Sequence, residues 1–146
     1  MKKTEFAKIL LPAFSIMTVF VASSPNGVMI FDGTTVVYQN WLQTVAQTNV
    51  GWCAPVAALL NYVIFGLAVI YLFTKKSWSL KPILYLAAAA TCILSLPVVS
   101  EGDIKVVPNA LGIILLAAEA ITAAMLSKKE QTAQQKNTIG KRLERR

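Results

Sequence analysis

Apolar residues concentrate in four segments of the chain, with polar and charged residues between them. The segments cover residues 6–22, 53–73, 82–99 and 106–126. Each has about 17–21 residues, close to the roughly 20 that an α-helix needs to cross ~30 Å of hydrocarbon. The pattern therefore predicts an all-α membrane protein, in which residues 1–126 form a bundle of four transmembrane helices.

The composition argues against most other classes of protein. Of the 146 residues, 55% are hydrophobic and 14% are charged, which leaves too little polar surface for a soluble domain of this size. The chain has no His, no acid or Lys is paired with a nucleophile in a recognisable motif, and Cys53 and Cys92 are far apart. We therefore expect no enzymatic activity, cofactor, metal site, disulfide or nucleic-acid partner.

The basic residues predict the direction of the helices. All lysines and arginines except Lys105 lie before or at the very start of the first apolar segment, between the second and third, or after the fourth. The positive-inside rule places these three regions, and so both termini, in the cytoplasm. The Met-Lys-Lys start and the small size favour a bacterial cell membrane. A second interpretation is that residues 1–24 form a cleaved signal peptide, since small residues follow the first apolar segment.

The connection between the first two segments, residues 23–52, is long and almost uncharged. In it, Asp32-Gly33 stands between the apolar or β-branched runs 28–31 and 34–38, a strong signal for a short extracytoplasmic β-hairpin. An isolated hairpin is marginal in water, so it is expected to lean on the bundle or the membrane. A bundle with a β segment at this place resembles the layout of claudin-type tetraspan proteins. The resemblance is one of layout, because the Trp…Gly-Leu-Trp…Cys…Cys signature of that family is not present in this connection.

Three tryptophans are expected at the two membrane surfaces. Trp41, Leu42 and Val45 fall on one face of a short predicted helix. This segment either rests at the outer interface, anchored by Trp41, or is a helical connector that covers the mouth of the bundle. Trp52 and Trp78 flank the second apolar segment on opposite sides, which are the positions of an aromatic belt.

Glu119 is the residue within the apolar segments that most needs an explanation. An ionised side chain at the centre of a bilayer costs about 2.5 kcal/mol or more, so such residues face the interior of a bundle and find a partner there. A spacing of three and four places Glu119 in a stripe of small and polar residues, which are typical of helix–helix contacts. The stripe comprises Asn109, Gly112, Leu116, Glu119 and Ala123. We expect a neutral, hydrogen-bonded carboxylic acid at this place.

Other predicted helices carry polar residues at a comparable depth. The candidate intramembrane cluster consists of Glu119, Asn61, Thr91, Ser95 and Asn109. Ser15 and Thr18 lie at a similar depth in the first helix. The cluster is either an ion, proton or substrate site, or a set of interhelical hydrogen bonds of about 1 kcal/mol or less each. A transport pathway needs several acidic groups or several copies of the chain, so one Glu favours the structural interpretation.

Residues 127–146 differ in character from the rest of the chain. They are polar and basic with almost no apolar content, so this cytoplasmic tail is expected to be disordered. Its charges are expected to bind anionic lipids at about 1 kcal/mol per charge. The basic residues expected at the lipid surface are Lys128, Lys129, Lys141 and Arg142. The alternatives are a tail that docks a partner and a solvated flank that only stops insertion.

Together these features indicate a protein that works by association. We expect an accessory or structural subunit of a membrane complex, joined to a protein partner or to further copies of itself. The alternative is a homo-oligomeric transporter or channel that uses Glu119. A third, weaker hypothesis is a membrane enzyme whose site is shared with a partner. No residue pattern in the chain identifies a substrate.

Overall fold

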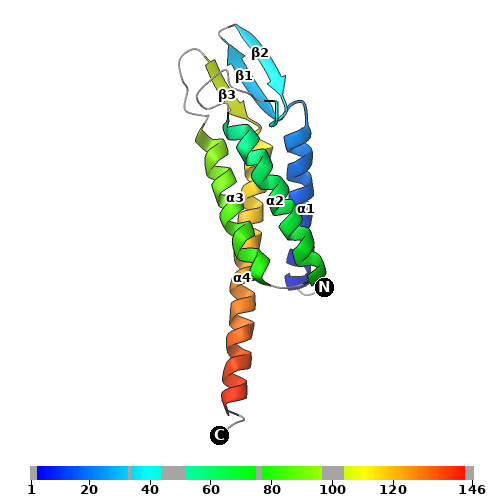
Figure 1. Cartoon of the computed structure of the whole chain (residues 1–146), viewed down its shortest axis with the longest axis vertical. Helices are drawn as coiled ribbons and strands as arrows, with labels where there is room; N and C mark the ends of the chain where they lie inside the picture. The colour runs from blue at the N-terminus through cyan, green and yellow to red at the C-terminus, as the bar shows by residue number, and fades with distance from the viewer. Residues whose placement is uncertain (1–2, 33, 44–51, 75–76, 97–103, 144–146) are drawn as a thin grey trace.

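The computed structural model shows an elongated helical bundle with a small β-sheet at one end, here called the sheet end (Figure 1). It describes residues 3–32, 34–43, 52–74, 77–96 and 104–143. The helices of the bundle are α1 (Lys3–Ser23), α2 (Cys53–Thr74), α3 (Leu80–Ser95) and α4 (Ala110–Leu143), with the short 3₁₀ helix η1 (Ser77–Ser79) before α3. In the bundle α1 and α3 each pack against both α2 and α4.

Three of the helices are long and apolar enough to cross a membrane. They are Phe6–Ser23 of α1, Cys53–Thr74 of α2 and Ala110–Ala133 of α4. The remaining helix, α3, is apolar but has only 16 residues, which corresponds to about 24 Å. The four helices are therefore confirmed; α3 is described from Leu80 to Ser95, and residues 97–99 of its predicted span lie outside the described residues.

Small side chains allow the helices to approach one another closely. The buried positions of α2 include Ala57, Ala58 and Ala68, and those of α3 include Ala87 and Ala90. Because α2 and α3 pack side by side, these alanines bring the two backbones together and let many atoms make van der Waals contact.

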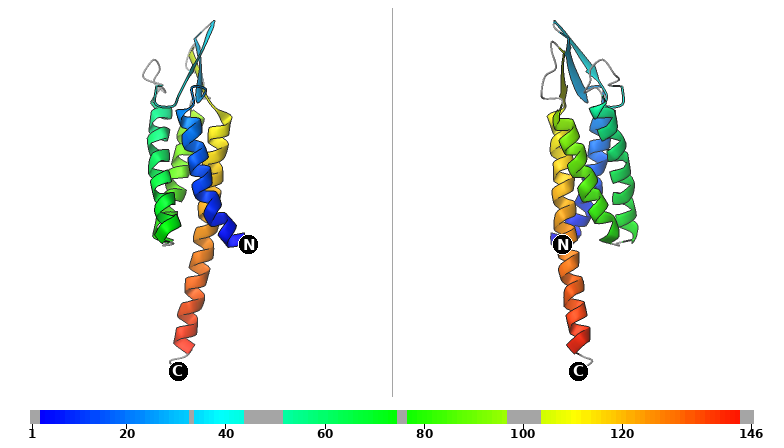
Figure 2. Two further views of the ribbon diagram at one scale, coloured as in Figure 1. Left: turned by 90° about the vertical axis from the view of Figure 1, so that its right-hand side faces the viewer. Right: turned by 60° about the vertical axis from the view of Figure 1, so that its left-hand side comes forward.

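The predicted β-hairpin is confirmed and is part of a larger sheet. Strands β1 (Val28–Asp32) and β2 (Thr35–Gln39) pair antiparallel, with Asp32 opposite Thr35. A third strand, β3 (Ile104–Pro108), pairs antiparallel with the other edge of β1, so that the strand order is β2-β1-β3. The sheet stands upright on the bundle in each view of Figures 1 and 2.

The third strand corrects the predicted start of the fourth helix. The sequence predicted a helix over residues 106–126, but α4 begins at Ala110 and residues 106–108 belong to β3. Three of the four residues 104–107 are β-branched (Ile104, Val106 and Val107), which suits a strand, and β1 offers it a partner. Asn109 then caps α4, because its Oδ1 accepts the backbone N–H of Leu111 at 2.9 Å.

The far end of α4 also differs from the prediction. Residues 127–143 continue α4 to Leu143 where the sequence predicted a disordered tail, and these turns project beyond the other helices (Figures 1 and 2). Extending an existing helix needs no new nucleus, and Lys, Glu, Gln and Ala favour helical backbone. The Tyr71 hydroxyl also donates to Glu130 Oε1 at 2.8 Å, which ties the start of this extension to α2.

Trp41 joins the sheet to the bundle. Its backbone N–H donates to the Ala22 carbonyl at 3.0 Å, and its indole N–H donates to the Gly27 carbonyl at 3.0 Å. The side chain is fully buried, so the expectation that Trp41 lies at a lipid-exposed interface is corrected. Residues 41–43 form a turn, and the rest of the predicted short helix lies outside the described residues.

Two glycines make room for the indole ring of Trp41. A Cβ atom on Gly27 would lie 2.7 Å from Trp41 Cδ1, and one on Gly112 would overlap the far edge of the ring at Cζ2. The ring thus fills the space between the turn after α1 and the first turns of α4. The stripe predicted that Gly112 contacts another helix; in the structure it lies against the Trp41 ring.

We predict that Gly112→Ala lowers the stability of the protein by about 1–3 kcal/mol, since the added methyl group overpacks the Trp41 site. The control is Gly66→Ala in α2, where an added Cβ meets no atom within 4 Å. That change should leave the thermal unfolding midpoint unchanged or raise it, because Ala favours helix over Gly. Equal midpoints for the two variants in the same detergent would contradict the role given to Trp41.

Candidate functional site in the bundle core

Glu119 lies in the interior of the bundle and has a partner on a neighbouring helix. Its side chain and that of Thr18 are both fully buried. The Thr18 hydroxyl and Glu119 Oε1 are 2.6 Å apart, which links α1 to α4. The prediction that Glu119 faces inward is therefore confirmed for the chain by itself.

The hydroxyl group of Thr18 has two acceptors within reach but only one hydrogen. Besides Glu119 Oε1 at 2.6 Å, the Phe14 carbonyl lies 2.9 Å from Thr18 Oγ1. An ionised Glu119 would accept the hydrogen bond of the Thr18 hydroxyl. The Phe14 carbonyl would then keep only its backbone hydrogen bond within α1. A neutral Glu119 can donate its own hydrogen to Thr18, whose hydroxyl then donates to Phe14. Only the neutral acid makes both contacts hydrogen bonds.

Two more buried polar residues lie at the depth of Glu119. Ser15 and Asn61 each lie eight residues inside the sheet ends of α1 and α2, and Glu119 lies nine inside that of α4. At 1.5 Å per residue these positions are about 12–14 Å deep. All three side chains are fully buried. With Thr18 they form what we call the polar layer of the bundle.

Several atoms of the polar layer have no hydrogen-bond partner among the described residues. They are Ser15 Oγ, both polar atoms of the Asn61 side chain, and Glu119 Oε2. A buried polar group without a partner costs about 1–3 kcal/mol. The layer therefore gains from any small species that supplies the missing bonds, such as a water molecule, a proton or a cation that prefers oxygen ligands. The described residues contain no group of three or more His, Cys, Asp and Glu suited to a metal ion.

The structure brings together only part of the cluster that the sequence predicted. Thr91 is half-buried and Ser95 is exposed, and each hydroxyl donates to a carbonyl of α3 itself, at 2.7 and 2.8 Å. Asn109 lies at the sheet end, where its Nδ2 is 3.3 Å from the Asn26 carbonyl and its Oδ1 caps α4. The hydrogen bonds of these three residues thus go to other groups, and the partner of Glu119 is Thr18.

The residues predicted at the two interfaces, Trp41 apart, lie on the surface where their side chains are described. Trp52 precedes α2 at the sheet end and Trp78 lies in η1 at the opposite end, and both are more than half exposed. Lys128 and Lys129 are also exposed. Lys141 and Arg142 belong to α4, but their side chains lie outside the described part of the structure. Cys53 and Cys92 are free thiols, the first buried and the second exposed.

No protein-family model matches the chain, and comparisons with curated proteins and with solved structures find no match. The proposals below therefore rest on the geometry of this chain.

We predict that Thr18→Val lowers the free energy of unfolding by about 1–3 kcal/mol, because it leaves the buried Glu119 carboxyl group without its hydroxyl partner. Thr91→Val is the control, since the Thr91 hydroxyl bonds only to its own helix and its loss should cost about 0.5 kcal/mol or less. Thermal unfolding in one detergent compares the two. A Thr18→Val protein as stable as Thr91→Val would show that the Glu119 contact contributes nothing.

Proposed function

We propose that the protein is a membrane protein of four spans, with both termini in the cytoplasm, that acts by association as an accessory subunit. The length and apolar character of α1, α2 and α4 support the placement in a membrane. In this placement the sheet end is outside, because the lysines and arginines other than Lys105 gather toward the opposite end of the helices. The 16-residue α3 is shorter than the hydrocarbon core, a mismatch that local thinning of the bilayer can accommodate.

The observation that carries the proposal is the open edge of strand β2. In the sheet order β2-β1-β3, β2 lies at an edge. Its side chains are exposed on both faces, with Val36 at 46%, Val37 at 45% and Tyr38 at 55%. Edge strands of monomeric proteins are commonly protected by charged residues, Pro or a bulge. Thr35–Gln39 contains no charged residue and no Pro.

The register of the sheet indicates which backbone groups this edge offers. Asp32 and Thr35 are paired across a two-residue connection, so we expect them to exchange hydrogen bonds, as the closing pair of such hairpins does. Bonded and non-bonded pairs alternate along an antiparallel ladder. The N–H and C=O groups of Val36 and Tyr38 therefore point away from β1. An extended segment of a partner could add to the sheet there.

Symmetry favours a different polypeptide over a simple dimer at this edge. Two copies inserted in the same direction are related by an axis along the membrane normal. Antiparallel pairing of β2 with itself needs a two-fold axis perpendicular to the sheet, and the sheet stands upright on the bundle (Figures 1 and 2). That axis would lie in the membrane plane, so the second copy would be inverted. A ring of copies would instead have to pair β2 with β3 of the neighbour.

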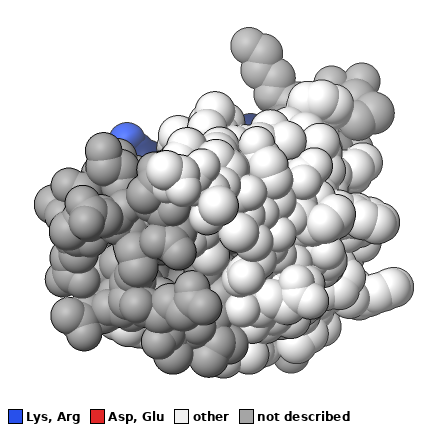
Figure 3. All heavy atoms as spheres, turned by 90° about the horizontal axis from the view of Figure 1, so that it is seen from above, with Lys and Arg blue, Asp and Glu red and all other residues white. Residues whose placement is uncertain are grey.

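The described part of the outer surface is also suited to contact with protein. Seen from the sheet end, the side chains that Figure 3 describes are almost all uncharged; the side chains of Asp32, Glu101, Asp103 and Lys105 lie outside the described part. Uncharged polar and aromatic surface is removed from water at lower cost than charged surface, and charged residues are depleted at the centres of interfaces.

We predict that the protein, extracted gently from its own membrane, has a native mass that includes a second polypeptide. Val36→Pro removes the outward N–H of β2 but keeps the hydrogen bonds between β2 and β1, so it should release that partner. Val36→Thr keeps the N–H and the β-branched shape, and should retain it. A mass equal to a whole number of 15.9 kDa chains, unchanged by Val36→Pro, would refute the accessory role at this edge.

The second candidate function is a small transporter or channel, and the unpartnered atoms of the polar layer favour it. Glu119 Oε2 and the Asn61 side chain are buried with no hydrogen-bond partner among the described residues, and ionisable groups within a membrane commonly mark a proton or ion pathway. On the accessory hypothesis, vesicles containing the protein should show no Glu119-dependent proton uptake after an acid pulse. Glu119→Gln keeps a bond to Thr18 and so should fold. Proton uptake by the natural protein that Glu119→Gln abolishes would establish transport instead.

A further inference from the structure

The unpartnered atoms of the polar layer come from three helices. They are Glu119 Oε2 on α4, Ser15 Oγ on α1 and both polar atoms of the Asn61 side chain on α2. All three side chains are fully buried, and none of these atoms has a hydrogen-bond partner among the described residues. Because nearly all buried polar groups in proteins are hydrogen-bonded, atoms left unpartnered together at one level call for a bound species.

Asn61 and Glu119 lie at the same level of the bundle. A contact further along the same two helices fixes their alignment, because the Tyr71 hydroxyl of α2 donates to Glu130 Oε1 of α4 at 2.8 Å. Both helices run away from the sheet end (Figure 1). Asn61 lies ten residues before Tyr71, or about 15 Å, and Glu119 lies eleven residues before Glu130, or about 16.5 Å.

The same contact indicates the direction in which the two side chains point. Eleven residues are close to three turns of helix, so Glu119 and Glu130 share one face of α4. Asn61 and Tyr71 both belong to the buried face of α2. The faces that meet at Tyr71 and Glu130 are thus the faces that carry Asn61 and Glu119. We infer that these two side chains point toward each other across the centre of the bundle.

The other two helices complete the surroundings of this level. On α1, Thr18 bonds to Glu119, and Ser15 lies three residues away on the buried side of the same helix. On α3, the fully buried Ala87 lies eight residues inside Ser95. Its small side chain leaves the centre of the bundle to the polar groups of the other three helices.

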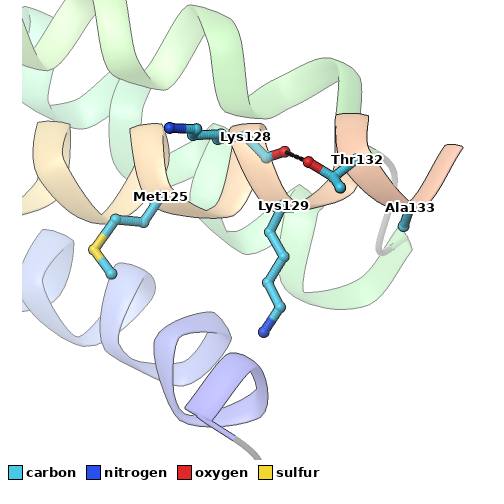
Figure 4. Close-up of a pocket in the computed structure, with 5 residues that line it drawn as sticks. All are labelled: Met125, Lys128, Lys129, Thr132 and Ala133. Carbon is cyan, nitrogen blue, oxygen red and sulfur yellow. Dashed lines mark hydrogen bonds between the residues drawn. The ribbon is translucent and has the colours of Figure 1, made fainter. Parts of the chain in front are cut away.

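The described residues supply no positive charge at this level. Helix α2 contains no Lys or Arg. The nearest lysines of α1, α3 and α4 are Lys8, Lys81 and Lys128, six to nine residues, or about 9–14 Å, along their helices from this level. Lys128 and Lys129 lie at the groove near the far end of α4, where their side chains extend from opposite sides of the helix (Figure 4). An ionised Glu119 therefore needs a positive charge from outside the chain.

The charge and the ligand atoms of the layer select the species. One monovalent cation and one carboxylate are together neutral, whereas a divalent cation would leave a buried net charge. Carboxylate, amide and hydroxyl oxygens are the ligands of hard cations. The buried alanines of α2 and α3 bring the helices close together, which favours a small ion. The expectation of no metal site rested on the missing His and the separated Cys residues, which a sodium ion does not need.

We propose that the polar layer binds one sodium ion through Glu119 Oε2, Asn61 Oδ1 and Ser15 Oγ. The ion replaces the acid proton of the neutral Glu119, which is released to water, and the Thr18 hydroxyl then donates to Glu119 Oε1. The proposal deepens the second candidate function, since it names the ion that would be carried. As a binding site it requires neither transport nor a partner, so the two ideas can fail separately.

The test measures sodium binding to the full chain in detergent at constant ionic strength, with choline as the replacing cation. Equilibrium dialysis with radioactive sodium should find one ion per chain. Raising the sodium concentration from tenfold below to tenfold above half-saturation should raise the thermal unfolding midpoint by about 3–5 °C. Potassium over the same range should raise the midpoint by less than half as much.

Two substitutions and a matched control locate the ion. Glu119→Gln keeps a bond to Thr18 but removes the charge, and should weaken sodium binding about thirtyfold or more. Asn61→Leu replaces the amide by an apolar group of similar size. It should weaken binding about tenfold or more, yet leave the midpoint without sodium unchanged or higher. Glu130→Gln makes the same change on the same face of α4 and can still accept the Tyr71 bond, so its sodium affinity should stay within about twofold.

Several outcomes would overturn the proposal. Equal midpoints in sodium and choline, with no sodium retained on dialysis, would mean that only water or a proton occupies the layer. Equal effects of sodium and potassium would mean a response to salt without selection of the smaller ion. Sodium binding that survives Glu119→Gln would place the ion elsewhere. A protein that binds sodium at Glu119 but carries no ion into vesicles would contradict only the second candidate function.

Discussion

The Gly27 carbonyl accepts hydrogen bonds from the Trp41 indole and from the backbone N–H of Asn109, at 3.0 and 2.9 Å. Through this one oxygen the turn after α1, the segment after β2 and the start of α4 are held together. The Trp41 ring fills the space that Gly27 and Gly112 leave open. The position of the sheet on the bundle therefore depends on this anchored side chain.

A second constraint acts in the middle of the bundle. Glu119 and Thr18 are buried together, and a polar pair in an apolar core tolerates few alternative helix arrangements because each alternative would leave the carboxyl group without its bond. Asn61 and Ser15 add groups whose hydrogen bonds are not met by the described residues. The layer can thus fix the packing of α1 against α4 and still have capacity for a proton, a water molecule or an ion.

The two ends of the bundle offer different chemistry. The sheet end presents a strand edge without charged residues, and the opposite end carries the exposed lysines Lys128 and Lys129. The extension of α4 to Leu143 carries further basic residues away from the bundle along a rigid rod.

The sequence by itself determined the four helices and the hairpin, because the hydrophobic period and the Asp32-Gly33 signal are local properties of the chain. It also determined that Glu119 faces inward, since burial follows from the cost of exposing a carboxyl group to an apolar medium. Only the tertiary structure decided the role of Trp41, whose burial depends on two glycines, one of them 71 residues away. The same holds for β3, whose β-branched residues suit a strand but form one only where β1 supplies a hydrogen-bonding edge. Thr91, Ser95 and Asn109 donate to backbone carbonyls instead of to Glu119, because the sequence does not show which neighbour a polar side chain meets.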